Sequence, residues 1–318
     1  MKKISILTLS LIMFGNVAKA DVNTALNDLT TKKQAVQNAC SGIKSSLDTI
    51  FGLSVATTVS SGLGTAAAGG ALAVGITKAV KDKKIEEKEI ELGLLKARTE
   101  NLSDDPEELK KQLTEILPQL EEDYRRLQKE ISEDTKKSKT LGNIRTGLMA
   151  GATATSAVST GTSIGASLNA KKLAEKMEAC NKAVAGLKTA ISLAEAEEVD
   201  AEKLVKAREI TSACTGFDKY NIDSLKRSMT ASAIVSGIGT ATAGTGTVTS
   251  ALANSNKVRS DNSEKGRKKE KNLNLVSNIM AGVTTGTSGA STILSATAIK
   301  KAKQDSEMAE KCEAVLNQ

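Results

Sequence analysis

The residues best suited to chemistry in this 318-residue chain are its four cysteines, Cys40, Cys180, Cys214 and Cys312. Cysteine thiols pair as disulfides in an oxidising compartment or bind a metal as thiolates. These four lie far apart in sequence and form none of the close Cys-x-x-Cys pairs typical of zinc sites. We therefore expect two disulfides, with four free buried thiols as the alternative.

An internal duplication indicates which cysteines pair. Gly-Leu-Gly-Thr-Ala begins 22 positions after Cys40, and Gly-Ile-Gly-Thr-Ala begins 23 positions after Cys214. Met-Ala-Gly begins 31 positions before Cys180 and 32 before Cys312. If each half is an antiparallel helical hairpin, its two cysteines lie at the open end, which favours Cys40–Cys180 and Cys214–Cys312. Cys40–Cys312 with Cys180–Cys214 stays open from sequence. Each closure would stabilise the fold by about 4 kcal/mol.

Catalytic chemistry has little support in the sequence. Histidine is absent, and "GLGTAAAGG" and "GIGTATAGTG" lack the Lys-Ser/Thr ending of a phosphate-binding loop. The acidic pairs Asp104/Asp105 and Glu121/Glu122 lie in polar stretches where ordinary surface charge accounts for them. We therefore predict no enzyme, no cofactor, no metal and no small-molecule substrate.

A cluster of basic residues lies late in the chain and is lightly diluted by acids. We call it the basic cluster; it consists of Lys257, Arg259, Lys265, Arg267, Lys268, Lys269 and Lys271. Such a cluster suits contact with anionic lipid headgroups or another polyanion, although a solvated turn has the same composition. No aromatic residue lies nearby to stack on a base, so we expect no nucleic-acid partner.

The first 20 residues have the pattern of a cleaved signal peptide. A basic start is followed by an apolar run from Ile4 to Val17 and by the small-x-small site Ala18-Lys19-Ala20. The apolar run is shorter than the ~20 residues that a membrane-spanning helix needs. Cleavage would remove three lysines and lower the formal net charge from +7 to +4. We expect an exported protein, periplasmic or extracellular.

The composition predicts an all-α fold that positions these residues. Two prolines, 2% aromatic residues and an excess of Ala, Lys, Glu, Leu, Ser and Thr favour long helices over strands. We predict elongated antiparallel helical hairpins, related by the duplication, that form a four-helix bundle with a coiled-coil arm. The predicted parts are an N-terminal helix at 21–47, a first hairpin at 40–180, a connecting helix at 181–213 and a second, shorter hairpin at 214–312.

The coiled-coil arm is predicted at 78–139, where apolar residues recur every three or four positions. They run outward from Ile85 to Leu95 and back from Leu109 to Ile131. Asp105, Pro106 and Glu108 form a helix-start signal at the turn, and Pro118 should bend the returning helix. This arm is the predicted surface for a protein partner or for self-association.

Four segments carry no charge and are rich in Gly, Ala, Ser and Thr. We call them the uncharged segments; they span 49–77, 146–170, 228–256 and 272–299. Glycines spaced four apart lie on one helical face and allow close helix crossing, a pattern that resembles the glycine-zipper motif of several membrane-inserting and envelope proteins. The predicted helix-packing seam consists of Gly62, Gly70, Gly147, Gly151, Gly161, Gly165, Gly237, Gly282 and Gly286.

Two functions fit these observations. The favoured one is an exported structural or interaction protein, a disulfide-stapled helical bundle that binds a partner through its arm. The alternative is a conditional membrane-inserting protein, similar to a helical pore-former or translocator, that presents the uncharged segments to lipid. Their many Ser and Thr hydroxyls must then find partners inside the bundle or in water.

Overall fold

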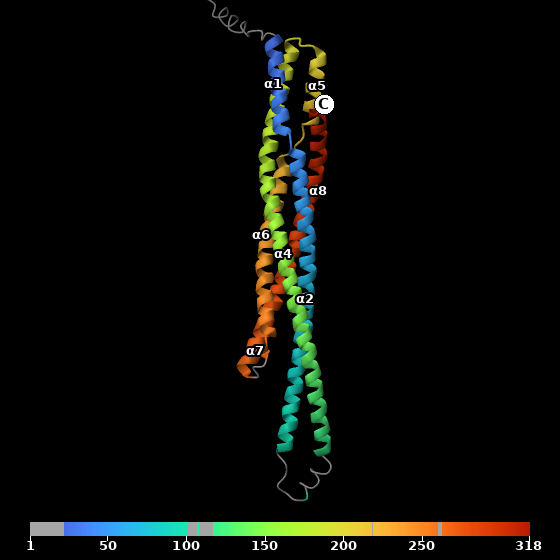
Figure 1. Ribbon diagram of the computed structural model, residues 1–318, viewed down its shortest axis with the longest axis vertical. Coiled ribbons are helices and arrows are strands. Elements are labelled where there is room, and N and C mark those ends of the chain that lie inside the picture. Colours follow the sequence, from blue (N-terminus) through green and yellow to red (C-terminus); the bar gives the residue numbers. More distant parts are fainter. Residues whose placement is uncertain (1–21, 101–106, 108–116, 218, 260–262) are drawn as a thin grey trace, which may run out of the picture. The chain divides into compact units, whose positions relative to one another are not determined.

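The computed structural model describes residues 22–100, 107, 117–217, 219–259 and 263–318, and these residues form helices and no strand (Figure 1). The helices are α1 (Val22–Cys40), α2 (Ile43–Glu100), α4 (Leu117–Ala196), α5 (Ala201–Ala213), α6 (Lys219–Asn254), α7 (Asn256–Arg259) and α8 (Glu264–Leu316). The all-α prediction is confirmed. The predicted signal peptide lies outside the described residues.

The chain divides into two compact units. Unit 1 comprises Met1–Leu53, Ala166–Ser228 and Thr297–Gln318, and unit 2 comprises Ser54–Gly165 and Met229–Ala296. The boundary falls inside α2, α4, α6 and α8, so each of these helices contributes to both units.

Unit 1 has an ordinary core of large aliphatic side chains. Leu47, Ile50, Leu173, Leu187 and Leu225 are fully buried there. Full burial of such a side chain stabilises a fold by about 1.5–3 kcal/mol. Two disulfides, Cys40–Cys180 and Cys214–Cys312, lie among these residues and are the pairs that the duplication favours. They are consistent with an oxidising compartment.

Short turns interrupt two helices that the sequence analysis treats as continuous. The predicted 21–47 helix breaks after Cys40, because Gly42 has a φ of 72°, which a helix cannot accommodate. The predicted 181–213 helix is the end of α4 followed by a turn and α5. Asp200 caps α5 by accepting a hydrogen bond from the Glu202 N–H at 3.1 Å.

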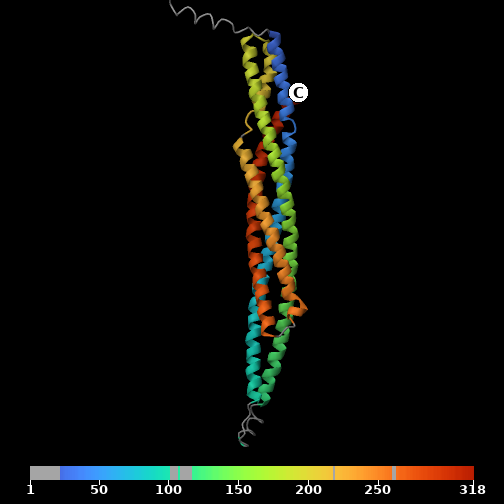
Figure 2. The same ribbon diagram turned by 90° about the vertical axis from the view of Figure 1, so that its left-hand side faces the viewer.

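In unit 2, α2, α4, α6 and α8 lie side by side in both views (Figures 1 and 2). Their uncharged segments are helical although Gly, Thr and Ser are poor helix formers in isolation. Contacts between these helices must therefore supply much of the stability of this unit.

The described part of the arm joins α2 to α4 by ion pairs. Asp134 lies 3.1 Å from the Lys81 Nζ and 3.0 Å from the Lys88 Nζ. The predicted turn residues Asp105, Pro106 and Glu108 lie outside the described residues. Pro118 is helical, and residues 108–116 before it lie outside the described residues, as does most of the predicted turn.

Candidate functional site

A closed ring of four serine hydroxyls lies inside unit 2, with one serine from each of α2, α4, α6 and α8. Around the ring, the oxygen separations are 2.5 Å for Ser61–Ser159, 3.0 Å for Ser159–Ser236, 2.7 Å for Ser236–Ser291 and 3.1 Å for Ser291–Ser61. All four residues are buried. Because a hydroxyl donates once and accepts up to twice, each member can be satisfied without water.

A second set of buried hydroxyl side chains adjoins the ring. Ser232 contacts Ser291 of the ring at 2.9 Å, and also Ser295 at 3.0 Å and Ser163 at 3.2 Å. Ser163 in turn donates to Thr57 at 3.4 Å. The ring and this second set form one continuous buried hydrogen-bond network across four helices. Such a network favours one packing arrangement of the helices over others.

Small apolar residues fill the next part of the interior. Ala68, Ala71, Ala152, Ala243 and Ala281 are fully buried there, and Met149 is the large side chain among them. Gly246 makes room for Met149, whose Cε would collide with any β-carbon at that position. The interior of this region is therefore built from small groups in close contact.

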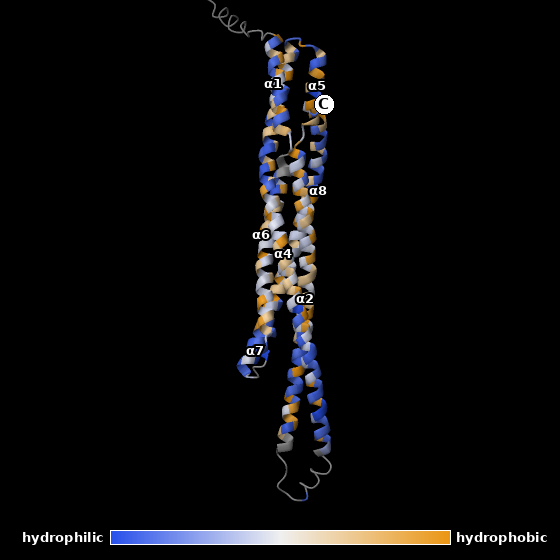
Figure 3. Ribbon diagram, in the orientation of Figure 1, coloured by the Kyte–Doolittle hydropathy of each residue, from blue (hydrophilic) through white to orange (hydrophobic). Residues whose placement is uncertain are grey.

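Large aliphatic side chains of the same segments point outward instead. We call this set the aliphatic surface; it consists of Val55, Val59, Leu63, Ile76, Val158, Ile164, Ile234, Ile238, Val248, Leu252, Leu275, Ile279, Val283 and Ile293. Their exposed fractions run from 37% at Val55 to 69% at Ile293. Figure 3 shows the uncharged segments pale to orange, in contrast to the blue of the arm. Residues of this kind normally form the core of a water-soluble protein.

Threonine hydroxyls near the outside are satisfied within their own helices. Thr65, Thr155, Thr245 and Thr287 each donate to the carbonyl four residues earlier, at 2.9–3.0 Å. A hydroxyl bonded in this way needs no water. The outer face is therefore less polar than its content of threonine implies.

Charged groups are buried where the uncharged segments end. Lys78 is 1% exposed, and its Nζ contacts Glu270 at 3.2 Å and Asp82 at 2.5 Å. Arg145 is equally buried and donates to the side chain and the carbonyl of Asn274 at 3.1 and 3.0 Å. Burial lowers the pKa of Arg145 to about 10. These contacts join α2, α4 and α8 at one end of the segments.

The basic cluster divides into paired and unpaired residues. Lys271 contacts Glu86 at 2.8 Å, Arg267 contacts Glu89 at 3.4 Å and Lys268 contacts Glu264 at 2.6 Å. Arg259 lies 3.5 Å from the Ser138 hydroxyl. Within the described chain, Lys257, Lys265 and Lys269 have no carboxylate within 4.0 Å.

Most glycines of the predicted seam do not lie at a contact between helices. A β-carbon would meet no other atom within 4 Å at Gly62, Gly147, Gly151, Gly161, Gly237, Gly282 or Gly286. A β-carbon at Gly70 would lie 3.4 Å from the Leu148 side chain, and Gly165 is half-buried. Those seven positions therefore make no close helix contact of the kind that the seam predicts.

Other glycines make the close approaches. A β-carbon at Gly64 would lie 3.1 Å from the Thr155 hydroxyl and 3.3 Å from that of Ser288. At Gly75 it would collide with the Asn278 side chain, and at Gly142 with that of Asn254. The sequence signal for these positions was the regular three-and-four spacing of Ser, Ala and Gly, such as Ser54, Thr57, Ser61, Gly64 and Ala68.

The described residues were also compared with the patterns of membrane-spanning helices, metal sites and known proteins. By length and composition alone, one candidate membrane-spanning helix lies within the described residues, inside the stretch Val22–Ala97. No group of His, Cys, Asp or Glu within the described ranges could hold a metal ion. Comparison of the chain with protein-family models, curated proteins and solved structures found no match.

Proposed function

We propose that this protein is exported and associates with a lipid bilayer, and that its uncharged segments form a four-helix bundle whose outer face contacts acyl chains. The observation that carries the proposal is the inverted packing of unit 2, with hydroxyls and small groups inside and the aliphatic surface outside. An exposed aliphatic surface of this extent marks an interaction with lipid or with another apolar surface.

The absence of charge favours lipid as the contact. All four segments lack Asp, Glu, Lys and Arg on every face, not only on the faces that touch another helix. A soluble helical protein places charges on its outer face. Each segment is also longer than the ~20 residues needed to cross the hydrocarbon core.

Basic residues adjoin the segment ends, where phospholipid headgroups would lie. These residues are Lys171, Lys172, Lys226, Arg227, Lys257, Lys271, Lys300 and Lys301. Lysine and arginine at this position suit an anionic membrane interface.

The hydroxyl groups need not oppose insertion. Unpaired hydroxyls in hydrocarbon are costly, but the buried serines bond to one another and the outer threonines bond to their own helices. This pairing supports membrane association of three segments whose mean hydropathy is modest, provided that the four helices enter together.

Two matched pairs of substitutions test the proposal. Leu63 and Val158 are 57% and 55% exposed and lie at the centres of their segments, whereas Leu193 and Val205 of unit 1 are 56% and 58% exposed. A lysine at the centre of a membrane helix costs about 2.5–3.5 kcal/mol. Leu63→Lys/Val158→Lys should reduce flotation with phosphatidylcholine vesicles at least ~100-fold, while Leu193→Lys/Val205→Lys floats like the wild type.

The outcome that contradicts the proposal is specific. If the oxidised wild-type protein stays in the dense fraction, or if both double variants float equally, the aliphatic surface does not meet lipid. A wild-type mass of two or more chains in buffer, reduced to one chain by Leu63→Lys/Val158→Lys, would identify a second copy as the true contact.

The arm supports a second candidate function, partner binding through a coiled coil. Ile90 and Leu94 of α2 are 61% and 62% exposed in an otherwise charged region. Apolar side chains at such positions suit a further helix packed against the arm. Ile90→Ser/Leu94→Ser should then lower the mass measured by light scattering if the partner is another copy, without altering vesicle flotation.

A further inference from the structure

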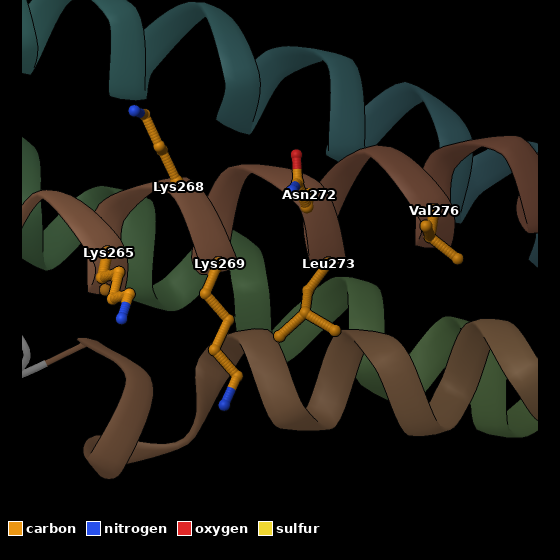
Figure 4. Close-up of a pocket in the computed structure, with 7 residues that line it drawn as sticks. Lys265, Lys268, Lys269, Asn272, Leu273 and Val276 are labelled. Carbon is orange, nitrogen blue, oxygen red and sulfur yellow. The ribbon is translucent and has the colours of Figure 1, made fainter.

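A groove at the start of α8 combines lysines with aliphatic side chains. It is lined by Lys265, Gly266, Lys268, Lys269, Asn272, Leu273 and Val276. In Figure 4, Lys265, Lys269 and Leu273 point to the same side of α8, whereas Lys268 and Asn272 point to the opposite side. Of the basic cluster, Lys265 and Lys269 therefore lie on the same side of α8 as Leu273.

The two lysines on this side have no ion-pair partner among the residues that the structure describes. Lys268 and Lys271 contact Glu264 and Glu86, whereas Lys265 and Lys269 have no carboxylate within 4.0 Å in the described chain. Two ammonium groups one helical turn apart form a local positive charge that attracts an anion.

The groove changes character along the helix axis. After the lysines come Leu273 and Val276 on the same helix, where the uncharged segment begins. The aliphatic surface continues from there at Ile279. This order, from cationic to aliphatic side chains, matches the order of phosphate and acyl chain in a phospholipid.

We infer that this groove binds one anionic phospholipid. Lys265 and Lys269 hold the phosphate, and Leu273 and Val276 contact the first part of an acyl chain. The inference rests on the proposed membrane association and adds a lipid class and a site to it.

A charge-matched comparison within the cluster tests the site. Lys265→Gln/Lys269→Gln and Lys268→Gln/Lys271→Gln remove the same charge from the same short stretch. Binding is measured to vesicles of phosphatidylcholine alone and of phosphatidylcholine with phosphatidylglycerol. Each lysine near an anionic surface strengthens binding about fivefold, so the first variant should lose roughly 30-fold of the preference for phosphatidylglycerol vesicles. The second should keep most of it.

Each result has a definite meaning. Equal losses in the two variants would overturn the site in favour of a diffuse positive surface. Wild-type binding to both vesicle types without any preference for phosphatidylglycerol would also overturn it, while leaving the proposed function intact. Failure to bind either vesicle type overturns both.

A third variant tests the apolar end of the groove. Leu273→Ser keeps every lysine, and it should weaken retention of phosphatidylglycerol in native mass spectra of the detergent-solubilised protein several-fold. Inorganic phosphate, which has no acyl chain, should not displace the lipid. If Leu273→Ser retains the lipid like the wild type, or if phosphate displaces it, the groove binds an anion and not a phospholipid.

Discussion

Units 1 and 2 use the same helices but bury opposite kinds of residue. Unit 1 buries leucine, isoleucine and two disulfides, whereas the uncharged region of unit 2 buries serine, alanine and glycine and exposes valine, leucine and isoleucine. In unit 1 the hydrophobic effect and covalent links favour folding in water. In unit 2 the interior gives little hydrophobic free energy, and hydrogen bonds with close helix contact take its place.

This difference indicates that the two units suit different surroundings. A core of large aliphatics needs water outside to be stable, whereas a core of satisfied hydroxyls and small residues does not. Changes that act on one kind of core should therefore leave the other kind unaffected, and the predictions below test this separation.

The largest effect should come from the disulfides, and it should be confined to unit 1. Cys40→Ser/Cys180→Ser opens a link between residues 140 apart, for which the chain-entropy model gives about 5 kcal/mol. Hydrogen exchange should accelerate strongly around Leu173 and Leu187 and little around Ala68 and Ala152. Equal acceleration in both places would show that the two cores depend on each other.

The serine ring should give the next largest effect. Ser159→Ala removes two hydrogen bonds of the ring, so that Ser61 and Ser236 each keep only Ser291 as a ring partner. At about 0.5–1.5 kcal/mol for each buried hydrogen bond, the loss should be about 1–3 kcal/mol. Thermal unfolding of the detergent-solubilised protein measures the loss. The control is Ser192→Ala, which removes an exposed hydroxyl that bonds only to its own helix, to the Lys188 carbonyl. Similar melting temperatures for the two variants would contradict a structural role for the ring.

The sequence predicts part of this contrast. Composition and apolar spacing indicate helices, and the duplication favours the observed cysteine pairs. The sequence does not predict which side of each uncharged helix is buried. Large aliphatic residues are normally assigned to the interior, but here Leu63 points outward and Ser61 points inward. Helix rotation depends on three neighbours at once, so motif spacing alone selected outward glycines such as Gly151 instead of Gly64.

Alanine substitutions should distinguish a glycine at a helix contact from a glycine with no neighbouring atom, as the uncharged segments 49–77 and 146–170 provide one of each. Gly64→Ala places a methyl 3.1 Å from the Thr155 hydroxyl and should destabilise by about 1 kcal/mol or more, because the neighbours must move apart. Gly151→Ala meets no atom within 4 Å and should stabilise by up to ~1 kcal/mol through helix propensity. Opposite shifts in melting temperature are expected. If Gly151→Ala destabilises the protein instead, Gly151 lies at a helix contact, as the seam predicted from the sequence requires.

The smallest effect should appear in the arm on acidification. Hydrogen bonds from Lys88 and Lys81 hold the pKa of Asp134 below its ordinary value of 3.8. A carboxyl group whose pKa is lowered in the folded state stabilises that state above the unfolded pKa, and the effect disappears as pH falls through the lower folded value. Hydrogen exchange, corrected for its intrinsic pH dependence, should therefore accelerate near Lys88 and Asp134 only below about pH 4. Asp134→Asn should remove this group's part of the pH response, and the serine ring, which has no titratable member, should show no such response. Loss of protection at the ring over the same pH range would mean that the arm and the hydroxyl core unfold as one element.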